Sequence, residues 1–155
     1  MGGFIYSNKL HRHTVVRKLR IDAGHRLVDH EGKCSSFHGH SYTFEIYACS
    51  DELDNVGRVT DFGVIKEIIG TWIDANLDHA MILNTKDPFV YLWSSTGPLV
   101  DMKVFYLPYN PSAENLASFM LEVSNDLLIS AGHGHVKVVK VVCQETPNCS
   151  ATAEL

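Results

Sequence analysis

The chain has 155 residues, 45% hydrophobic and 20% charged, which is typical of one globular domain with a sizeable core. Its formal net charge of -5 lacks the basic excess of a broad nucleic-acid surface, so we expect no nucleic-acid partner. The sequence contains neither the roughly 20 apolar residues of a membrane span nor an N-terminal secretion signal, which predicts no membrane partner and a cytoplasmic location. Its four cysteines include no Cys-x-x-Cys pair, which argues against a disulfide framework or a zinc ribbon.

Two strands are predicted first along the chain. Residues 14–28 and 38–49 place apolar side chains at alternate positions, the pattern of strands with one buried face. The period then lengthens after Thr60 and Asp61, either of which can act as an N-cap. A helix is predicted there, with a buried stripe made of Phe62, Ile65, Ile69 and Trp72.

Residues 86–109 contain turn signals and a short apolar run, Lys103–Leu107, which predicts a surface excursion with one extra strand. A second helix is predicted from about Pro111–Ser112 to Gly132. Residues 135–145 again resemble a strand, and a weak further strand is expected over 148–155. The inner stripe of the second helix is predicted to be Leu116, Met120, Val123 and Leu127.

These elements predict an α+β fold in which two helices cover one face of a mainly antiparallel sheet. No repeat or linker divides the chain, so we expect an N-terminal extension over residues 1–13 and a single domain over 14–155. The small sheet has exposed edges, and these favour oligomerisation.

The nine histidines are the most unusual feature of the composition. His38 and His40 are two residues apart on one predicted strand, so their side chains share a face. His25 lies on the buried side of the preceding strand, and the connection 26–37 can fold back to bring all three together. Three histidines with an open fourth position are typical of catalytic zinc, and Gly39 would leave room for a substrate. The alternative is that they are ordinary strand histidines.

The other histidines are predicted to be solvated turn or loop residues. His11 and His13 lie in a polar segment with no third ligand nearby, and His30 falls in a predicted loop. His133 and His135 repeat the His-Gly-His string, but at a helix-to-strand turn with no preceding cysteine.

Three further positions carry chemistry. Cys34 stands beside Lys33 and near the predicted metal site, where positive charge favours a reactive thiolate. Asp78 and His79 are adjacent, and a carboxylate can fix the tautomer of an imidazole and raise its basicity. Glu145 ends an apolar strand, where the carboxylate is either capped by local backbone or holds a ligand.

With these residues assembled, the chain resembles the 6-pyruvoyltetrahydropterin synthase / 6-carboxytetrahydropterin synthase family of T-fold pterin enzymes, over about residues 14 to 153. The resemblance is carried by GHRL (24–27), CSSFHGHSY (34–42), VTDF (59–62), LDHAMILN (77–84), NPSAENLA (110–117) and ETP (145–147).

The resemblance implies roles for these positions. The three histidines match the family's zinc ligands, and Cys34 matches its catalytic cysteine, with Asp78 and His79 as the partner pair. Glu145 matches the carboxylate that holds the 2-amino-pyrimidinone edge of the pterin. The segment that lines the pterin pocket contains Ser112 and Glu114. The resemblance also implies trimers whose sheets join into a barrel, two of them stacked as a hexamer, with active sites shared between chains.

The implied substrate is 7,8-dihydroneopterin triphosphate. Three residues separate Cys34 from His38, a spacing that resembles the 6-carboxytetrahydropterin branch of the 7-deazaguanine (queuosine) pathway, which releases acetaldehyde and triphosphate. The alternatives are the pyruvoyl-forming branch and a non-catalytic zinc- or pterin-binding module. Candidates for triphosphate contacts are Lys33, Arg26 and Arg58, which can equally be solvated surface charges.

Overall fold

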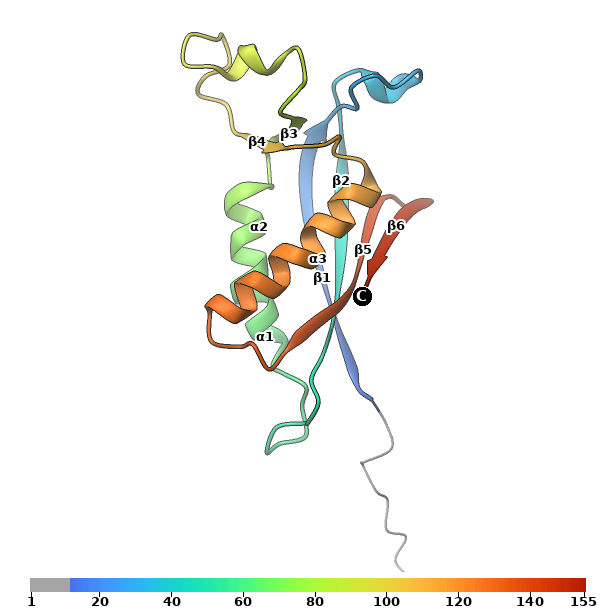
Figure 1. Ribbon diagram of the computed structural model, residues 1–155, viewed down its shortest axis with the longest axis vertical. Helices are drawn as coiled ribbons and strands as arrows, with labels where there is room; N and C mark the ends of the chain where they lie inside the picture. Colours follow the sequence, from blue (N-terminus) through green and yellow to red (C-terminus); the bar gives the residue numbers. More distant parts are fainter. Residues whose placement is uncertain (1–11) are drawn as a thin grey trace, which may run out of the picture.

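A computed structural model describes residues 12–155, so most of the expected N-terminal extension, including His11, lies outside the described residues. No helix in the described range is long and apolar enough to cross a membrane. The described chain forms a six-stranded sheet in the order β4-β3-β1-β2-β5-β6, with helices packed on one face (Figure 1). The strands are β1 (Thr14–His25), β2 (His38–Cys49), β3 (Met81–Asn84), β4 (Val104–Leu107), β5 (Lys137–Thr146) and β6 (Cys149–Glu154).

The β1–β2 hairpin is the centre of the sheet and confirms the two strands predicted first. Its antiparallel register runs without interruption from Thr14 opposite Cys49 to His25 opposite His38. Alternation along both strands directs one set of side chains to the helices, and the largest of β2, Tyr42, is fully buried there. Each such side chain contributes about 1.5–3 kcal/mol through burial. The hairpin is therefore held rigidly by the core, and so are the residues at its loop end.

The first predicted helix is a continuous helical run made of α1 (Phe62–Ile65), a π-helical turn η3 (Lys66–Gly70) and α2 (Thr71–Asn76). Asp61 caps it, because its Oδ1 accepts a hydrogen bond of 2.7 Å from the Gly63 amide. Phe62, which we expected on the buried stripe, is instead 50% exposed at the first turn. The stripe that reaches the core is Ile65, Ile69 and Ile73.

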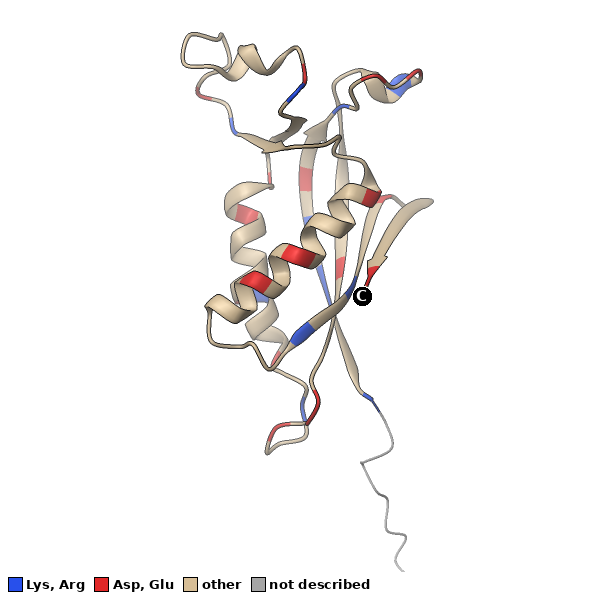
Figure 2. Cartoon of the chain, viewed as in Figure 1, with Lys and Arg blue, Asp and Glu red and all other residues tan. Residues whose placement is uncertain are grey.

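The second predicted helix is α3 (Ala113–Ser130). Its end is fixed by Gly132, whose φ of 82° is a left-handed conformation that glycine adopts at little cost. The buried stripe is rotated relative to the prediction: Val123 and Leu127 are half-buried, and Ser124 and Leu128 take their places. Acidic side chains follow the exposed face of this helix (Figure 2), namely Glu114, Glu122 and Asp126.

The sheet is less antiparallel than the sequence predicted. β3 pairs in parallel with both β1 and β4, and β3 itself was not predicted. It has four residues and no alternation, so its sequence carries no periodic signal. The excursion after it is confirmed, with a 3-10 turn η4 (Val90–Trp93) and the expected short strand β4.

The C-terminal strands pair as a hairpin on the other side of β2, which confirms the further strand at the end of the chain. A register shift separates the pairs Tyr47–Lys140 and Ala48–Val138. Because of this register shift, the side chain of Val138 points into the core, whereas Val139 is only half-buried.

Candidate metal centre and active site

The three candidate metal ligands meet at the loop end of the β1–β2 hairpin. His25 pairs with His38 across the ladder and Ala23 pairs with His40, so all three imidazoles project from the helix-covered face. One ligand nitrogen of each histidine lies within 4.8 Å of the others, and Nε2 of His25 is 3.0 Å from Nε2 of His38. The strand register therefore brings the expected cluster together.

Backbone carbonyls fix the other nitrogen of two of these rings. Nδ1 of His25 is 2.8 Å from the Pro111 carbonyl, and Nδ1 of His38 is 2.8 Å from the Ser36 carbonyl. A carbonyl only accepts hydrogen bonds, so both Nδ1 atoms carry hydrogen and the neutral rings leave Nε2 as a bare acceptor. Two bare acceptors 3.0 Å apart repel each other unless a cation lies between them. Carbonyl-anchored rings of this kind are typical of metal-binding histidines.

Burial lowers the pKa of the His25 imidazole, although its bond to Pro111 opposes that shift. The neutral form that metals bind is thus favoured. Nitrogen ligands about 2.0–2.1 Å from zinc lie about 3.3 Å apart in a tetrahedron, close to the 3.0 Å between the Nε2 atoms of His25 and His38. The residues present fit a metal ion of that kind.

Glu145 adds a carboxylate to the cluster. Its Oε1 lies 3.2 Å from Nε2 of His25 and 3.2 Å from Nε2 of His40. Within residues 12–155 no backbone amide donates to this carboxylate, so the local capping that the sequence left open does not occur. The carboxylate faces the ligand nitrogens.

Cys34 lies in a 3-10 turn, η2 (Lys33–Ser35), and is half-buried. The Leu27 amide donates to the Cys34 carbonyl at 2.8 Å, which folds the connection back toward the end of β1. Tyr42 lies under the cluster, with its ring centroid 5.8 Å from that of His25. Burial raises its pKa, and the negative charge of Glu145 raises it further.

Asp78 and His79 form the expected pair just after α2. Oδ2 of Asp78 is 2.8 Å from Nδ1 of His79, and its Oδ1 accepts from the Asp22 amide at 2.9 Å. His79 has a φ of 57° and a 77% exposed side chain. A left-handed histidine is strained unless its surroundings hold it, and the bond from its amide to the Asp22 carbonyl does so. Burial is the largest single effect on the pKa of Asp78 and raises it, but the bonds from Asp22 and His79 and the nearby positive charge of Lys103 together lower the pKa below its usual value.

This pair is not bonded to the metal cluster of the same chain. Within the described residues, no hydrogen bond or ion pair joins Asp78 or His79 to Cys34 or to the three histidines. Asp22, which anchors the pair, has the opposite strand parity from His25 and so belongs to the other face of the sheet. A hollow of about 790 Å³ opens beside the pair, and both His79 and the metal ligand His40 line it, together with Phe37, Trp93 and Met102.

Gly39, which we expected to leave room for a substrate, lines the same hollow as His40 and His79. It lies opposite Gly24 in the ladder and faces away from the cluster, toward the hollow. A Cβ atom at this position would be 3.0 Å from the Ala23 carbonyl oxygen. Glycine is needed here for close approach of the two strands.

The remaining expected site residues are placed less centrally. Ser112 caps α3, with its Oγ accepting from the Asn115 amide, and Glu114 lines a groove between α3 and β6. Neither bonds to the histidine cluster. His30 and the pair His133 and His135 lie in turns and loops, as predicted.

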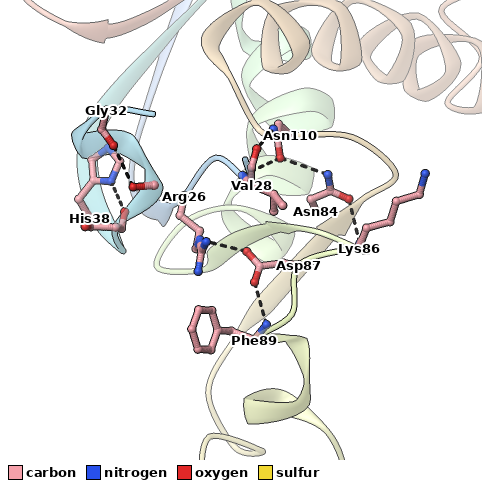
Figure 3. Close-up of polar contacts among 11 residues, drawn as sticks. Arg26, Val28, Gly32, His38, Asn84, Lys86, Asp87, Phe89 and Asn110 are labelled. Carbon is pink, nitrogen blue, oxygen red and sulfur yellow. Dashed lines mark hydrogen bonds and ion pairs between the residues drawn. The ribbon is translucent and has the colours of Figure 1, made fainter. Parts of the chain in front are cut away.

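Sequence reasoning missed Asn110 as a residue that supports the site. Its side chain bonds both the amide (3.0 Å) and the carbonyl (2.8 Å) of Val28, and its Oδ1 accepts from Asn84 at 3.1 Å (Figure 3). This clamp holds the chain after β1 against Pro111, whose carbonyl anchors His25. The available signal was an Asn-Pro dipeptide directly before a helix N-cap.

Comparison with known proteins agrees with this geometry. The family model described as 6-pyruvoyl tetrahydropterin synthase matches residues 14–155. A protein of Rickettsia conorii named 6-carboxy-5,6,7,8-tetrahydropterin synthase is 38% identical over 136 residues, covering 86% of this chain and 94% of the relative. Proteins of the same name from Rickettsia bellii and Aquifex aeolicus are 39% and 32% identical, over 86% and 88% of the chain and 94% of each relative.

Solved structures share the fold. An uncharacterised protein from Wolinella succinogenes superposes with a TM-score of 0.77 at 22% identity, over 92% of this chain and 98% of the other. The 6-pyruvoyl tetrahydropterin synthase of Caenorhabditis elegans gives 0.65 at 21% identity, over 96% and 99%. The sheet with two helices is thus the T-fold predicted from the motifs. With a family match over residues 14–155 and relatives above 30% identity along most of its length, the chain belongs to the 6-pyruvoyl tetrahydropterin synthase family.

Proposed function

We propose that this enzyme, a lyase of its family, converts 7,8-dihydroneopterin triphosphate to 6-carboxy-5,6,7,8-tetrahydropterin, acetaldehyde and triphosphate. The observation that carries the proposal is the identity of 38% to a synthase of that name over 94% of the relative's length. The three-residue spacing between Cys34 and His38 favours the same product.

We propose zinc as the metal, held by His25, His38 and His40. Three histidines leave a fourth position for substrate, as catalytic zinc requires. When bound, the ion supplies Lewis acidity toward the substrate's side-chain hydroxyl oxygens, which acidifies the neighbouring protons. The Pro111 and Ser36 carbonyls keep two of the rings in the ligating orientation.

The proton transfers fall to residues of this chain. Cys34 acts as the base that removes a proton from a side-chain carbon, and His79 exchanges protons on the opposite side of the substrate. Asp78 holds the Nδ1 hydrogen of His79, which leaves Nε2 free for that exchange. The side chain loses two electrons in total and the ring gains two, so no external reductant is required. One water molecule supplies the additional oxygen of the carboxylate.

Glu145 is proposed to bind the pterin ring. The 2-amino group and the adjacent ring N–H present two parallel donors, which a carboxylate accepts in bidentate fashion. The support is its position, because Oε1 is 3.2 Å from two ligand nitrogens and is not taken up by backbone amides of the described chain. A ring held there has its reactive side chain next to the metal.

Product analysis tests the function. Purified, zinc-loaded protein is incubated with 7,8-dihydroneopterin triphosphate and the products are identified by mass spectrometry. We expect the carboxytetrahydropterin together with acetaldehyde. Pyruvoyltetrahydropterin without acetaldehyde would establish the alternative reaction instead, and zinc and pterin binding without turnover would identify a binding module.

We further propose that each active site is shared between neighbouring chains of a hexamer. The support is the exposed His79, which within residues 12–155 has no hydrogen bond or ion pair with Cys34 of its own chain, and the edge strands β4 and β6, which offer unpaired backbone groups. Ring assembly with heterologous contacts would bring one chain's His79 to the next chain's Cys34.

Subunit mixing gives a direct test of the shared site. Cys34→Ala and His79→Ala chains, each inactive alone, are unfolded together in equal amounts and refolded. Random assembly leaves both groups intact at about one quarter of the interfaces, so we expect about a quarter of wild-type activity. Mixing Cys34→Ala with the Cys34→Ala/His79→Ala double variant is the matched control and stays inactive. A fully active monomer, or no rescue after proven exchange, would refute the shared site.

A further inference from the structure

Arg26 is enclosed rather than solvated. Its side chain is only 12% exposed, and its Nε lies 3.2 Å from Oδ2 of Asp87, whose side chain is fully buried (Figure 3). The guanidinium carbon is 5.3 Å from the ring centroid of Phe37 and 4.9 Å from that of Phe89. Both distances are within the range of cation–π contacts.

These contacts join the segments that carry the metal ligands. Arg26 follows His25 directly, and Phe37 directly precedes His38. Phe37 also packs on Phe89 and Trp93 of the excursion after β3, with ring centroids 5.6 and 6.1 Å apart. The Arg26 side chain therefore links the residue that follows one metal ligand, His25, to the residue that precedes another, His38.

Asp87, the carboxylate that pairs with Arg26, is itself held in place by hydrogen bonds. Asp87 Oδ1 accepts from the Phe89 amide at 2.8 Å, and the Asp87 amide donates to the Asn84 carbonyl at 2.9 Å. Asn84 is in turn bonded to Asn110. A buried carboxylate needs its cationic partner, because an unpaired charge in the interior is strongly destabilising.

We infer that Arg26 is a positioning residue that sets the relative placement of His25 and His38, and with them Cys34, and that it does not bind the substrate's triphosphate. A planar guanidinium can stack on two rings while it pairs with a carboxylate, which a lysine ammonium cannot reproduce. The segment after β3 therefore helps to position the metal ligands, because its residues Asp87 and Phe89 hold the Arg26 side chain in place.

The effect on turnover rests on the proposed function, whereas the effect on metal affinity does not. Arg26→Lys keeps the positive charge but loses the planar guanidinium group, which stacks on the rings of Phe37 and Phe89 while it pairs with Asp87. Loss of a group that orients metal ligands costs about 10–100-fold in metal affinity or activity. We expect a weaker zinc affinity of that size in chelator competition, an equal fall in kcat, and a KM within about threefold of wild type.

Two further variants keep the test decisive. Phe89→Leu leaves the ion pair in place and removes one ring, and should weaken zinc binding by a smaller factor in the same direction. Arg20→Lys is the matched control, because Arg20 is exposed on β1 and has the opposite strand parity from His25. It should leave zinc affinity, kcat and KM unchanged.

A raised KM with unchanged kcat and zinc affinity in Arg26→Lys would make Arg26 a phosphate contact and overturn the inference. Unchanged zinc affinity in both Arg26→Lys and Phe89→Leu, with both variants folded by circular dichroism, would also overturn it. If wild-type protein binds zinc without turnover, the proposed function fails and the zinc measurements still decide the role of Arg26.

Discussion

His38→Ala is expected to abolish stable zinc binding and, with it, all turnover. His38 contributes one of the three clustered ring nitrogens, and its loss leaves two protein ligands from a set that already has an open position. The Ser36 carbonyl also loses its partner, so the turn between Cys34 and β2 is released. The measurement is metal analysis of the folded, dialysed variant, together with the rate of product formation.

His133→Ala is the matched control for this experiment. It belongs to the second His-Gly-His string but lies in the turn before β5, remote from the cluster in sequence and fold. It should retain one zinc ion per chain and wild-type turnover. A full zinc content in folded His38→Ala would remove this histidine from the metal site.

Cys34→Ala is expected to keep both zinc and the fold while turnover falls by about 100- to 10,000-fold, the range for loss of a general base. The variant removes a half-buried sulfur but no backbone contact, because the Leu27 amide bonds the Cys34 carbonyl, which alanine retains. Metal content and thermal unfolding should therefore match wild type. The rate is measured at saturating substrate, so that a change in kcat is separated from a change in binding.

Cys149→Ala serves as the control for loss of a thiol. Cys149 is exposed on the edge strand β6, and its replacement should leave kcat unchanged. Near-normal kcat in Cys34→Ala would exclude this cysteine from the mechanism. A loss of zinc in that variant would instead give it a structural role.

The sequence by itself determined the metal cluster and the main hairpin. His25, His38 and His40 were found from strand parity, because a period of two places alternate side chains on one face whatever the rest of the fold does. Helix caps were equally local, as Asp61 and Ser112 show. Family motifs supplied the remainder of the T-fold and the roles proposed for Cys34 and Glu145, which periodicity cannot provide.

Only the tertiary structure decided which groups meet across distant segments. β3 is four residues long and exists because β1 and β4 pair with it in parallel, a long-range contact that leaves no periodic pattern. The rotated stripe of α3 follows from packing on a bulged β5. From the sequence, Arg26 was a candidate either for a triphosphate contact or for a solvated surface charge. The burial of Asp87, 61 positions later in the chain, makes it an internal ion pair, because charges in the interior require partners that only the folded chain supplies.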